Sequence, residues 1–452
     1  MDKIISDIPI IKTFIKDDKY YCYDTYTNSL LNVSKEIYIE ICKMKEIGLF
    51  EYRNLRDSHS AYIDVISLLE KGLFKFDFIK EIYHPDTKYV GQLIDRCISQ
   101  LIIEVTNACN FKCRYCHQSE KAITECKMIN EDIAYKSIDY LFEHSKDANE
   151  IAITFYGGEP LLNFGIIEKI VNYSNLKFES KPILYNMTSN ASLIREEMIS
   201  FFVENKFSLL ISLDGDKIIQ NRHRKYLSDG KGTFDDVWNN ILKIRDNYPN
   251  YFDIYVSFNA VVMPNEDSEK VIDFFARNDI RKNKVTLTKA DLTGIDYFSE
   301  IHIANKKVYS KDYLEEYKDI LDCFMKKNRL PSKWHHSGPC VPGARRLFVN
   351  VDGDFYPCEK VDGAKGCLLG NLHSGIDLEK AVELLNIGRL TNEDCKKCWA
   401  MRFCSMCVKQ CLDGDSISCE KKKSSCKLMK EQAFSFLIAY VDNSKIGGQM
   451  IL

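Results

Sequence analysis

Apolar positions recur along the chain in two patterns. Short apolar runs, typical of buried strands, alternate with stretches that carry an apolar residue every three or four positions, as amphipathic helices do. The runs predict strands over 101–105, 151–156, 183–187, 209–213, 254–262 and 285–288. The clearest helices are predicted over 194–205, over 234–245, and after Asn130, where Ala134, Ile138, Leu141 and Phe142 would point inward. Repeated strand–helix units imply a parallel sheet, and about six of them fit a partial (β/α)6 barrel with its active site at the C-terminal strand ends.

The first 80 or so residues carry a different pattern. Residues 20–23 form an aromatic strand candidate, and residues 30–33 follow a turn and can pair back on it. Ser34 is a plausible cap for a first helix, and a second helix is predicted from about His59 to Gly72. A hairpin followed by helices is winged-helix-like. An N-terminal structural cap is the alternative interpretation.

Regular periodicity fades from about residue 330, where Gly, Asp, Lys and Cys dominate. Such a segment needs another source of stability, and metal ligation can supply it. A last helix is predicted over 427–441, packed back on the barrel. The expected domains are a leading module, a barrel, a cysteine-rich domain and a C-terminal helix or tail, over residues 1–85, 95–300, 330–430 and 431–452.

Composition narrows the possible partners and the compartment. The 452 residues carry 62 Lys and Arg against 65 Asp and Glu, a net charge of −3, which argues against a strongly basic nucleic-acid binder. We see neither a transmembrane-length apolar run nor a signal peptide, so we expect a cytoplasmic protein without membrane or nucleic-acid partners. In that reducing compartment the 18 cysteines are expected to be metal ligands or catalytic groups rather than disulfides.

The first cysteine cluster follows the first barrel strand. Cys109, Cys113 and Cys116 have the spacing C-x3-C-x2-C. Three thiolates on one loop can hold three corners of a 4Fe–4S cluster and leave the fourth iron free for a substrate or cofactor. A zinc site, with His117 as an additional ligand, is the alternative.

This motif resembles that of the radical SAM superfamily. The family places an aromatic residue before the last cysteine, as Tyr115 stands here, and the resemblance implies that Tyr115 lies at the cofactor. Gly157, Gly158 and Glu159, in the run GGEP after the second strand, match the motif that holds the methionine amine of S-adenosylmethionine. Glycines allow close backbone approach, and a carboxylate can accept hydrogen bonds from an ammonium group.

Later strand ends extend the resemblance, which covers about residues 98–290. It implies ribose contact by Asn190, further cofactor contact by Ser212, carboxylate pairing by Arg224 with Arg222 as a second candidate, and adenine contact near Val261. The implied chemistry is reductive cleavage of S-adenosylmethionine to methionine and a 5′-deoxyadenosyl radical, which abstracts a hydrogen atom from the substrate. An external electron donor such as flavodoxin or ferredoxin is implied as a partner.

The second cysteine region resembles the SPASM extension of radical SAM enzymes. Gly353-x4-Cys358 and Cys395-x2-Cys398-x5-Cys404 match its pattern, while Cys407 stands one residue early. The resemblance implies two auxiliary 4Fe–4S clusters, three in all. Cys340, Cys358 and Cys407 would ligate the nearer one, and Cys395, Cys398, Cys404 and Cys426 the farther one.

Several ligand assignments in this region stay open. Cys411 is the alternative to Cys407, and Cys419 the alternative to Cys426. The fourth ligand of the nearer cluster is Cys323, His335 or His336, or its iron is open to a substrate thiolate. A zinc ribbon is the alternative for the whole region, because C-x2-C pairs are typical zinc spacings.

SPASM-bearing enzymes mostly modify peptides or proteins. The leading module resembles an element that binds a precursor's leader peptide by strand addition. Across the runs ISLDGD, DGKGTFDDV and HHSGPCVPGARRLFVNVDGDFYPC, the chain resembles Cys-rich and thioether-forming maturases of ribosomal peptides, and we predict a thioether crosslink in a precursor peptide. The alternatives are carbon–carbon or carbon–oxygen crosslinking, sulfatase-type protein oxidation, and a non-enzymatic zinc protein that binds peptide or RNA. The sequence assigns no general acid or base.

Overall fold

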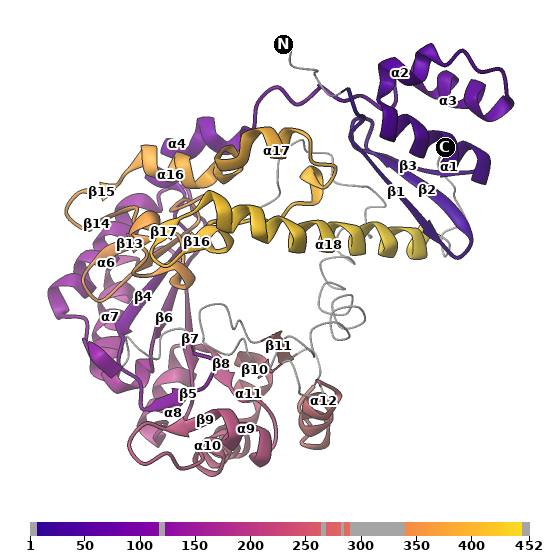
Figure 1. The fold of residues 1–452 in the computed structure, drawn as a ribbon. Coiled ribbons are helices and arrows are strands. Elements are labelled where there is room, and N and C mark those ends of the chain that lie inside the picture. Colours follow the sequence, from indigo (N-terminus) through magenta and orange to yellow (C-terminus); the bar gives the residue numbers. More distant parts are fainter. Residues whose placement is uncertain (1–6, 117–122, 264–267, 282–283, 290–339, 445–452) are drawn as a thin grey trace. The chain divides into compact units, whose positions relative to one another are not determined.

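A computed structural model describes residues 7–116, 123–263, 268–281, 284–289 and 340–444 (Figure 1). The chain forms two compact units. One comprises residues 1–88, 313–340 and 382–452, and the other residues 89–312 and 341–381. The predicted ligands Cys323, His335 and His336, and the alternative ligand His117, lie outside the described residues.

The second unit is built on a parallel sheet. Six of its strands are neighbours in the order β4-β6-β7-β8-β10-β11, and every neighbouring pair among them is parallel. Their bounds are Gln100–Thr106, Ile151–Gly157, Ile183–Ser189, Ser208–Ser212, Val256–Val262 and Val285–Lys289. The predicted α/β class and partial barrel are confirmed. Residues 254 and 255 are helical rather than extended, because Pro249 starts a short helix, α11 (Pro249–Tyr255).

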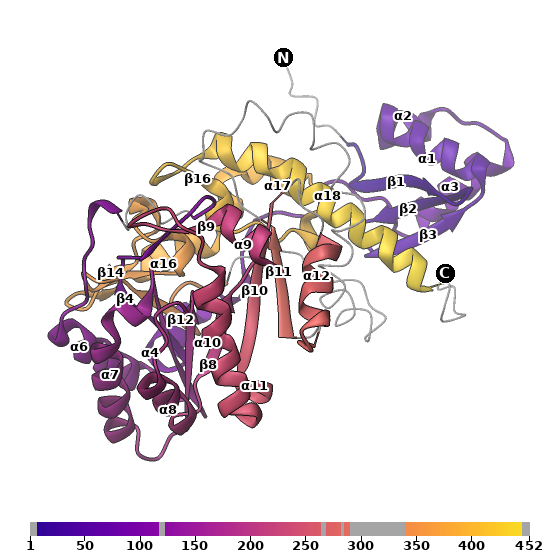
Figure 2. The same ribbon diagram turned by 90° about the horizontal axis from the view of Figure 1, so that it is seen from below.

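Helices connect and cover these strands (Figure 2). They are α6 (Glu131–His144), α7 (Phe164–Lys177), α8 (Glu196–Glu204), α10 (Phe234–Asn247) and α12 (Ser268–Arg277). Asn130 caps α6 as predicted, since its Oδ1 accepts a hydrogen bond from the Ile133 N–H at 2.8 Å. Phe142 was expected to be buried but is 45% exposed. It follows Leu141 directly, and one helical step turns it away from the buried stripe.

Four further strands extend the sheet beyond β4. β12 (Arg346–Val349) pairs with β4 in parallel, and β13 (Asp354–Tyr356), β14 (Gly370–Asn371) and β15 (Gly375–Ile376) follow in antiparallel order. Residues 347–349 are buried. Residues 341–381 therefore belong to the unit of the barrel, which differs from the predicted cysteine-rich domain over 330–430.

The first unit contains an antiparallel sheet in the order β1-β2-β3, over Ile11–Lys16, Lys19–Asp24 and Ser29–Val33. The helices α1 (Lys35–Ile47), α2 (Leu49–Asn54) and α3 (Ser60–Glu70) follow. The Ser34 side chain caps α1, as predicted, and the His59 side chain caps α3 at the predicted start of that helix. The first strand was not predicted, and the winged-helix identity of this module stays a prediction.

The C-terminal helix α18 (Cys419–Ser444) packs on this N-terminal sheet. Phe14, Tyr21 and Tyr23 form one apolar cluster with Leu437 and Val441. The opposite sheet face, with Ile11 and Cys22, packs with residues of α1, α2 and α3. The described apolar contacts of α18 thus place it on this sheet, where the sequence suggested the barrel.

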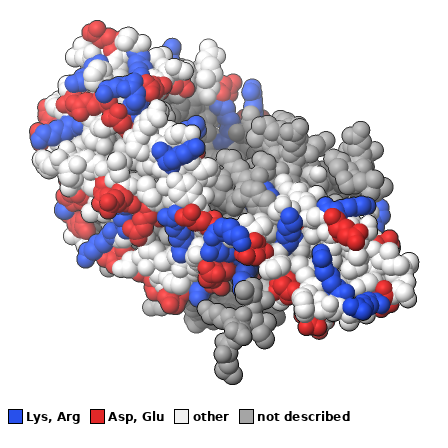
Figure 3. Space-filling model, turned by 90° about the horizontal axis from the view of Figure 1, so that it is seen from above, with Lys and Arg blue, Asp and Glu red and all other residues white. Residues whose placement is uncertain are grey.

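Shorter elements complete the described chain. They are η1 (Pro85–Tyr89), α4 (Val90–Arg96), β5 (Phe111–Cys113), η2 (Pro160–Asn163), α9 (Lys217–His223), β9 (Arg224–Tyr226), η4 (Glu359–Val361), η5 (Lys365–Cys367), α16 (Leu378–Leu385), η6 (Ile387–Thr391), α17 (Asn392–Lys396), η7 (Met401–Phe403), η8 (Val408–Cys411), β16 (Leu412–Asp413) and β17 (Ser416–Ile417). None of the helices in the described ranges has the length and apolarity needed to cross a membrane. Acidic and basic side chains are interspersed on the face drawn in Figure 3.

Candidate functional site

The cysteine loop follows β4 and is held by a small two-stranded ribbon. β5 pairs antiparallel with β9, so that Cys113 lies opposite Arg224. The Cys116 N–H donates to the Cys113 carbonyl at 3.2 Å, and the Phe111 N–H donates to Cys109 Sγ at 3.4 Å. The ribbon thus positions the middle cysteine of the predicted cluster motif.

The three thiols lie within electrostatic reach of one another. The pKa of Cys109 is raised to about 12, chiefly by burial and in addition by Glu159, Cys113 and Cys116. Burial also raises the pKa of Cys113 to about 11, against the lowering effect of Arg224. Metal coordination deprotonates such thiols outright. A set of three thiols on one loop fits a 4Fe–4S cluster, or zinc, by the chemistry of its donors.

Their spacing is not that of an assembled site. Within the described ranges, no group of three or more His, Cys, Asp or Glu side chains has the arrangement needed to hold a metal ion. The loop therefore offers suitable donors, although its described side chains are not arranged around a metal ion.

The two glycines of the GGEP run pack against the backbone that leads into this loop. A Cβ on Gly157 would lie 1.9 Å from the Thr106 carbonyl oxygen, and one on Gly158 would lie 2.2 Å from that of Ala108. The Gly158 N–H donates to Thr106 at 3.0 Å and the Glu159 N–H donates to Ala108 at 2.9 Å. Only glycine fits these two positions, because any side chain would displace the cysteine loop.

Glu159 is completely buried and accepts three hydrogen bonds. The donors are the Leu161 N–H at 3.1 Å, the Ser189 hydroxyl at 2.8 Å and the Asn190 N–H at 2.7 Å. Burial raises the pKa of this carboxyl to about 7, although the three hydrogen bonds act to lower it. In this structure Glu159 links the ends of β6 and β7.

The other predicted cofactor contacts lie at or near the C-terminal ends of the parallel strands. Asn190 follows β7, and its Nδ2 donates to Asn110 Oδ1 of the cysteine loop at 2.9 Å. Ser212 ends β8 beside Asn259 of β10. Val261, near the end of β10, is 8% exposed. The structure therefore brings these residues to the edge of the sheet where the cysteine loop begins.

Arg224 forms a buried ion pair that the sequence did not reveal. Its Nε and Nη2 donate to the two carboxylate oxygens of Asp214 at 3.0 and 3.1 Å. The Tyr115 hydroxyl donates to the same carboxylate, and the Val261 N–H donates to it at 2.9 Å. The guanidinium also lies 5.4 Å from the Tyr115 ring centroid. Asp214 was missed as a site residue, although the run ISLDGD that contains it was noted.

Four of the auxiliary cysteines belong to the first unit and lie within electrostatic reach of one another, although the described side chains there do not form an assembled metal site. The pKa of Cys404 is raised by burial and further by Cys398, Cys395 and Cys426. These are the four thiols predicted to ligate the farther cluster, and a set of four cysteines fits a 4Fe–4S cluster. Their donor chemistry also fits structural zinc.

The remaining candidate cysteines do not form one group within a unit. Cys407 and the fully buried Cys411 both belong to the first unit, and the Cys411 thiol donates to the Cys407 carbonyl at 3.5 Å. Cys340 is exposed, and Cys358 belongs to the other unit. The alternative ligand Cys419 directs its thiol to the Leu390 carbonyl at 3.5 Å. The ligand set of the nearer cluster therefore stays a prediction.

Lys422 of α18 is 2% exposed and lies among these cysteines. Its ammonium group donates to the Thr391 hydroxyl and, at 3.2 Å, to Cys395 Sγ. Burial raises the pKa of Cys411 and Cys426, and Lys422 acts against this rise. Sequence reasoning missed it, because it stands in the run EKKK, which resembles a solvated helix surface.

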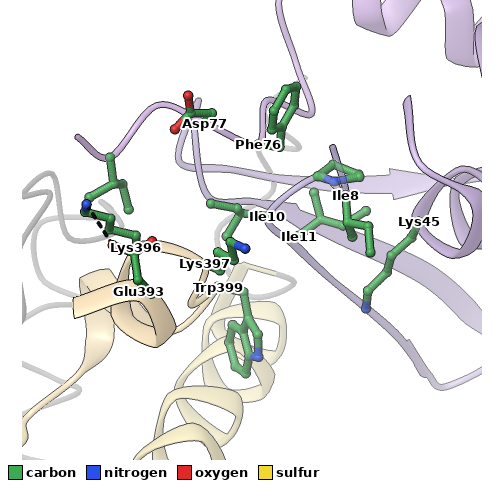
Figure 4. A pocket seen from close by; sticks show the side chains of 12 residues that line it. Ile8, Ile10, Ile11, Lys45, Phe76, Asp77, Glu393, Lys396, Lys397 and Trp399 are labelled. Atoms are coloured by element: carbon green, nitrogen blue, oxygen red, sulfur yellow. Dashed lines mark hydrogen bonds and ion pairs between the residues drawn. The ribbon is translucent and has the colours of Figure 1, made fainter. Parts of the chain in front are cut away.

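A groove of about 320 Å³ in the first unit combines apolar and basic side chains. Figure 4 shows Lys45, Lys397 and Trp399 around Ile10 and Ile11. Lys396 also lines the groove but is paired with Glu393 at 3.1 Å. The acidic side chains of Asp77 and Glu393 also line the groove.

Comparison with known proteins identifies the barrel. Residues 103–277 match the Radical SAM superfamily model. An uncharacterized protein of Methanocaldococcus jannaschii, MJ0907, is 29% identical over 61% of this chain and 89% of its own length. The cysteine-type anaerobic sulfatase-maturating enzyme of Clostridium perfringens (strain ATCC 13124) is 24% identical over 77% of this chain and 99% of its own length.

A solved structure agrees in fold. Native anSMEcpe with bound AdoMet aligns with 76% of this chain and 99% of its own, with a TM-score of 0.54 and 22% identity. The barrel of this protein is thus a radical SAM domain, related in sequence to anaerobic sulfatase-maturating enzymes. The protein is an enzyme, and the match to the radical SAM superfamily implies S-adenosylmethionine and a 4Fe–4S cluster as its cofactors. The alternative of a non-enzymatic zinc protein is set aside.

Proposed function

We propose that this enzyme modifies a ribosomally made precursor peptide, with a thioether crosslink as the product. The observation that carries the proposal is the cysteine loop, held between the GGEP backbone and the β5–β9 ribbon at the C-terminal end of the parallel sheet. The related Clostridium perfringens enzyme is named for maturating a protein, and anSMEcpe has been solved with AdoMet and a Cp18Cys peptide. We extend peptide modification from those relatives to this chain.

The proposed cofactors are S-adenosylmethionine and three 4Fe–4S clusters. Cys109, Cys113 and Cys116 would hold the first cluster, whose chemistry when bound is the one-electron supply that cleaves the sulfonium. Gly157, Gly158, Asn190 and Ser212 would line the cofactor, and Tyr115, Arg224 and Val261 would shape its site through Asp214. We propose a reducing, cytoplasmic setting with flavodoxin or ferredoxin as the electron donor.

The cluster count is tested by iron and sulfide analysis after anaerobic reconstitution. Changing Cys109, Cys113 and Cys116 together to Ala should remove one third of the iron and all S-adenosylmethionine cleavage. Cys126→Ala is the matched control, because Cys126 is an exposed thiol just after the same loop. Zinc in place of iron at these sites would contradict the proposal.

The leader of the precursor is proposed to bind the N-terminal sheet and the adjoining groove. Strand addition at β3, which has one neighbour in the described sheet, would supply backbone hydrogen bonds. The groove around Trp399 would receive acidic and apolar side chains. Deleting residues 1–80 would strip α18 of its apolar partners, so point variants are the sharper test.

Lys45→Glu reverses a charge that lines the groove, and Lys43→Glu reverses one on the same helix outside it. The first should weaken precursor binding about tenfold and the second should leave it unchanged, since like charges at an interface are strongly unfavourable. Substrate-free S-adenosylmethionine cleavage should be the same in both. Equal precursor affinity for the two variants would count against this binding site.

The product is tested by mass spectrometry of the reacted precursor, before and after iodoacetamide. A thioether requires loss of two hydrogens, one from the cysteine sulfur and one from the acceptor carbon, and one fewer alkylatable cysteine. Loss of two hydrogens with every cysteine still alkylatable would favour a carbon–carbon or carbon–oxygen crosslink. Oxidation of one residue without a crosslink would favour the sulfatase-type activity, the second candidate because of the relative in Clostridium perfringens.

A further inference from the structure

The β5–β9 ribbon has two faces of opposite character. Side chains alternate between the faces of a strand, so Phe111 and Cys113 point one way and Lys112 the other. Phe111 is buried and its ring meets that of Tyr226 edge to face at 5.1 Å. The inner face thus combines an aromatic pair with the thiol of a proposed cluster ligand.

The outer face of the same ribbon is basic. Lys112 lies directly opposite Lys225 in the strand register, and both are exposed. Arg114 and Arg222, also exposed, line a cavity of about 410 Å³ together with these lysines and Cys113. Four basic residues therefore surround the backbone of the cysteine that would bind iron.

Two lysines directly opposite each other weaken a strand pair, by up to about 1 kcal/mol. A ribbon as short as three residues on each strand, Phe111–Cys113 and Arg224–Tyr226, has little pairing energy to set against this repulsion. An anionic partner on the outer face would remove the repulsion. The outer face lies beside Cys113. A partner bound there would therefore be close enough to pass an electron to a cluster held by this cysteine.

We infer that the outer face of the β5–β9 ribbon is the docking surface of an acidic, one-electron carrier protein that reduces the first cluster. The inference rests on the proposed cluster at Cys109, Cys113 and Cys116. In the step it serves, the carrier loses one electron, the cluster gains one, and no bond or proton changes. Basic surfaces of this kind accelerate encounter with acidic proteins, and salt screens the effect.

The test compares two reductants of opposite charge. Cluster bleaching is followed by anaerobic stopped-flow absorbance, with either acidic flavodoxin hydroquinone or the reduced methyl viologen cation as donor. In Lys112→Glu/Lys225→Glu the flavodoxin rate at low salt should fall at least about tenfold, while the methyl viologen rate stays within about twofold. The control, Lys136→Glu/Lys169→Glu on α6 and α7, has the same change in net charge and should keep both rates.

Each outcome decides one question. Equal flavodoxin rates in both double variants would overturn the docking surface. Wild-type enzyme whose iron is not reduced by methyl viologen would instead contradict the proposed cluster. Lys112→Gln/Lys225→Gln is the milder second variant. Loss of iron from both ribbon variants would overturn the inference, because the two lysines would then be needed to retain the cluster rather than to bind the carrier. Binding of an RNA oligonucleotide that these variants abolish, with unchanged flavodoxin rates, would also overturn it.

Discussion

Lys422 gives the most direct prediction about the auxiliary cysteines. Its ammonium group is buried and reaches Cys395 Sγ at 3.2 Å, with the Thr391 hydroxyl as its other hydrogen-bond partner. A buried cation is costly unless a negative charge lies near it. A 4Fe–4S cluster on four thiolates supplies that charge, and reduction makes it more negative by one. Lys422→Met is therefore expected to lower the midpoint potential of the cluster bound at Cys395.

The size of the shift follows from Coulomb's law. The added electron is spread over the cluster beyond the sulfur, so we take a separation of about 5 to 8 Å between it and the Lys422 ammonium group. With a dielectric constant of about 20, the attraction between these two charges is about 2 to 3 kcal/mol. For a one-electron couple that corresponds to roughly 90 to 130 mV, since about 59 mV is a tenfold change. Hydrogen bonds to the ligand sulfur act in the same direction.

The assay is a redox titration of the reconstituted protein, followed by electron paramagnetic resonance. Lys422→Arg keeps the charge and should keep most of the potential. Lys423→Met is the matched control, because the Lys423 side chain is 58% exposed on the same helix and lies 3.7 Å from Asp394. Charge removal there is screened by water and should change the potential little.

The reasoning is refuted if Lys422→Met, with wild-type iron content, has the same midpoint potentials as wild type and Lys423→Met. Loss of the cluster in Lys422→Met but not in Lys422→Arg would still support the charge argument. Loss in both would assign Lys422 a packing role.

Three further predictions concern the barrel. Gly158→Ala should release the cysteine loop and abolish cluster retention, whereas Gly165→Ala, with open space around it in α7, should retain iron and gain about 0.5–1 kcal/mol of stability. Asp214→Asn leaves a buried guanidinium without its carboxylate and should cost about 3–5 kcal/mol in urea unfolding. Because the pKa of Glu159 is about 7 in the fold against 4.5 for an ordinary glutamate, the folded state keeps a proton that the unfolded chain loses. The unfolding free energy should therefore fall as pH rises from 4.5 to 7, by about 3 kcal/mol, and Glu159→Gln should flatten this dependence.

The barrel strands could be predicted because their signals are local. Each predicted run, such as 151–156 or 183–187, is rich in apolar residues. It could therefore be recognised as a strand without knowing which strand lies next to it in the sheet. Asn130 could be assigned as a cap because a cap bonds to the backbone three residues on. The first set of cluster ligands could be predicted for the same reason, since Cys109, Cys113 and Cys116 lie on one short loop.

The missed features depend on pairing between distant segments. β12 joins β4 although more than two hundred residues separate them, and its apolar run, 347–349, is too short to show a period that would distinguish a sheet strand from a loop. Lys422 and Asp214 were missed for a related reason. A charged residue is usually solvated, and only the fold shows that these two are buried.

Arg224 makes contacts in the structure that its expected role at the cofactor did not include. The sequence assigned its guanidinium to the carboxylate of the cofactor, yet Nε and Nη2 already bind Asp214, and Nη1 lies 3.9 Å from Cys113 Sγ. A guanidinium has five N–H donors in a fixed fork, so one edge can hold Asp214 while the remaining donors face the cysteine loop. The same carboxylate fixes the Tyr115 hydroxyl and the backbone of β10. Asp214 therefore connects the cysteine loop to the strand ends, and the site depends on a buried ion pair as much as on its thiols.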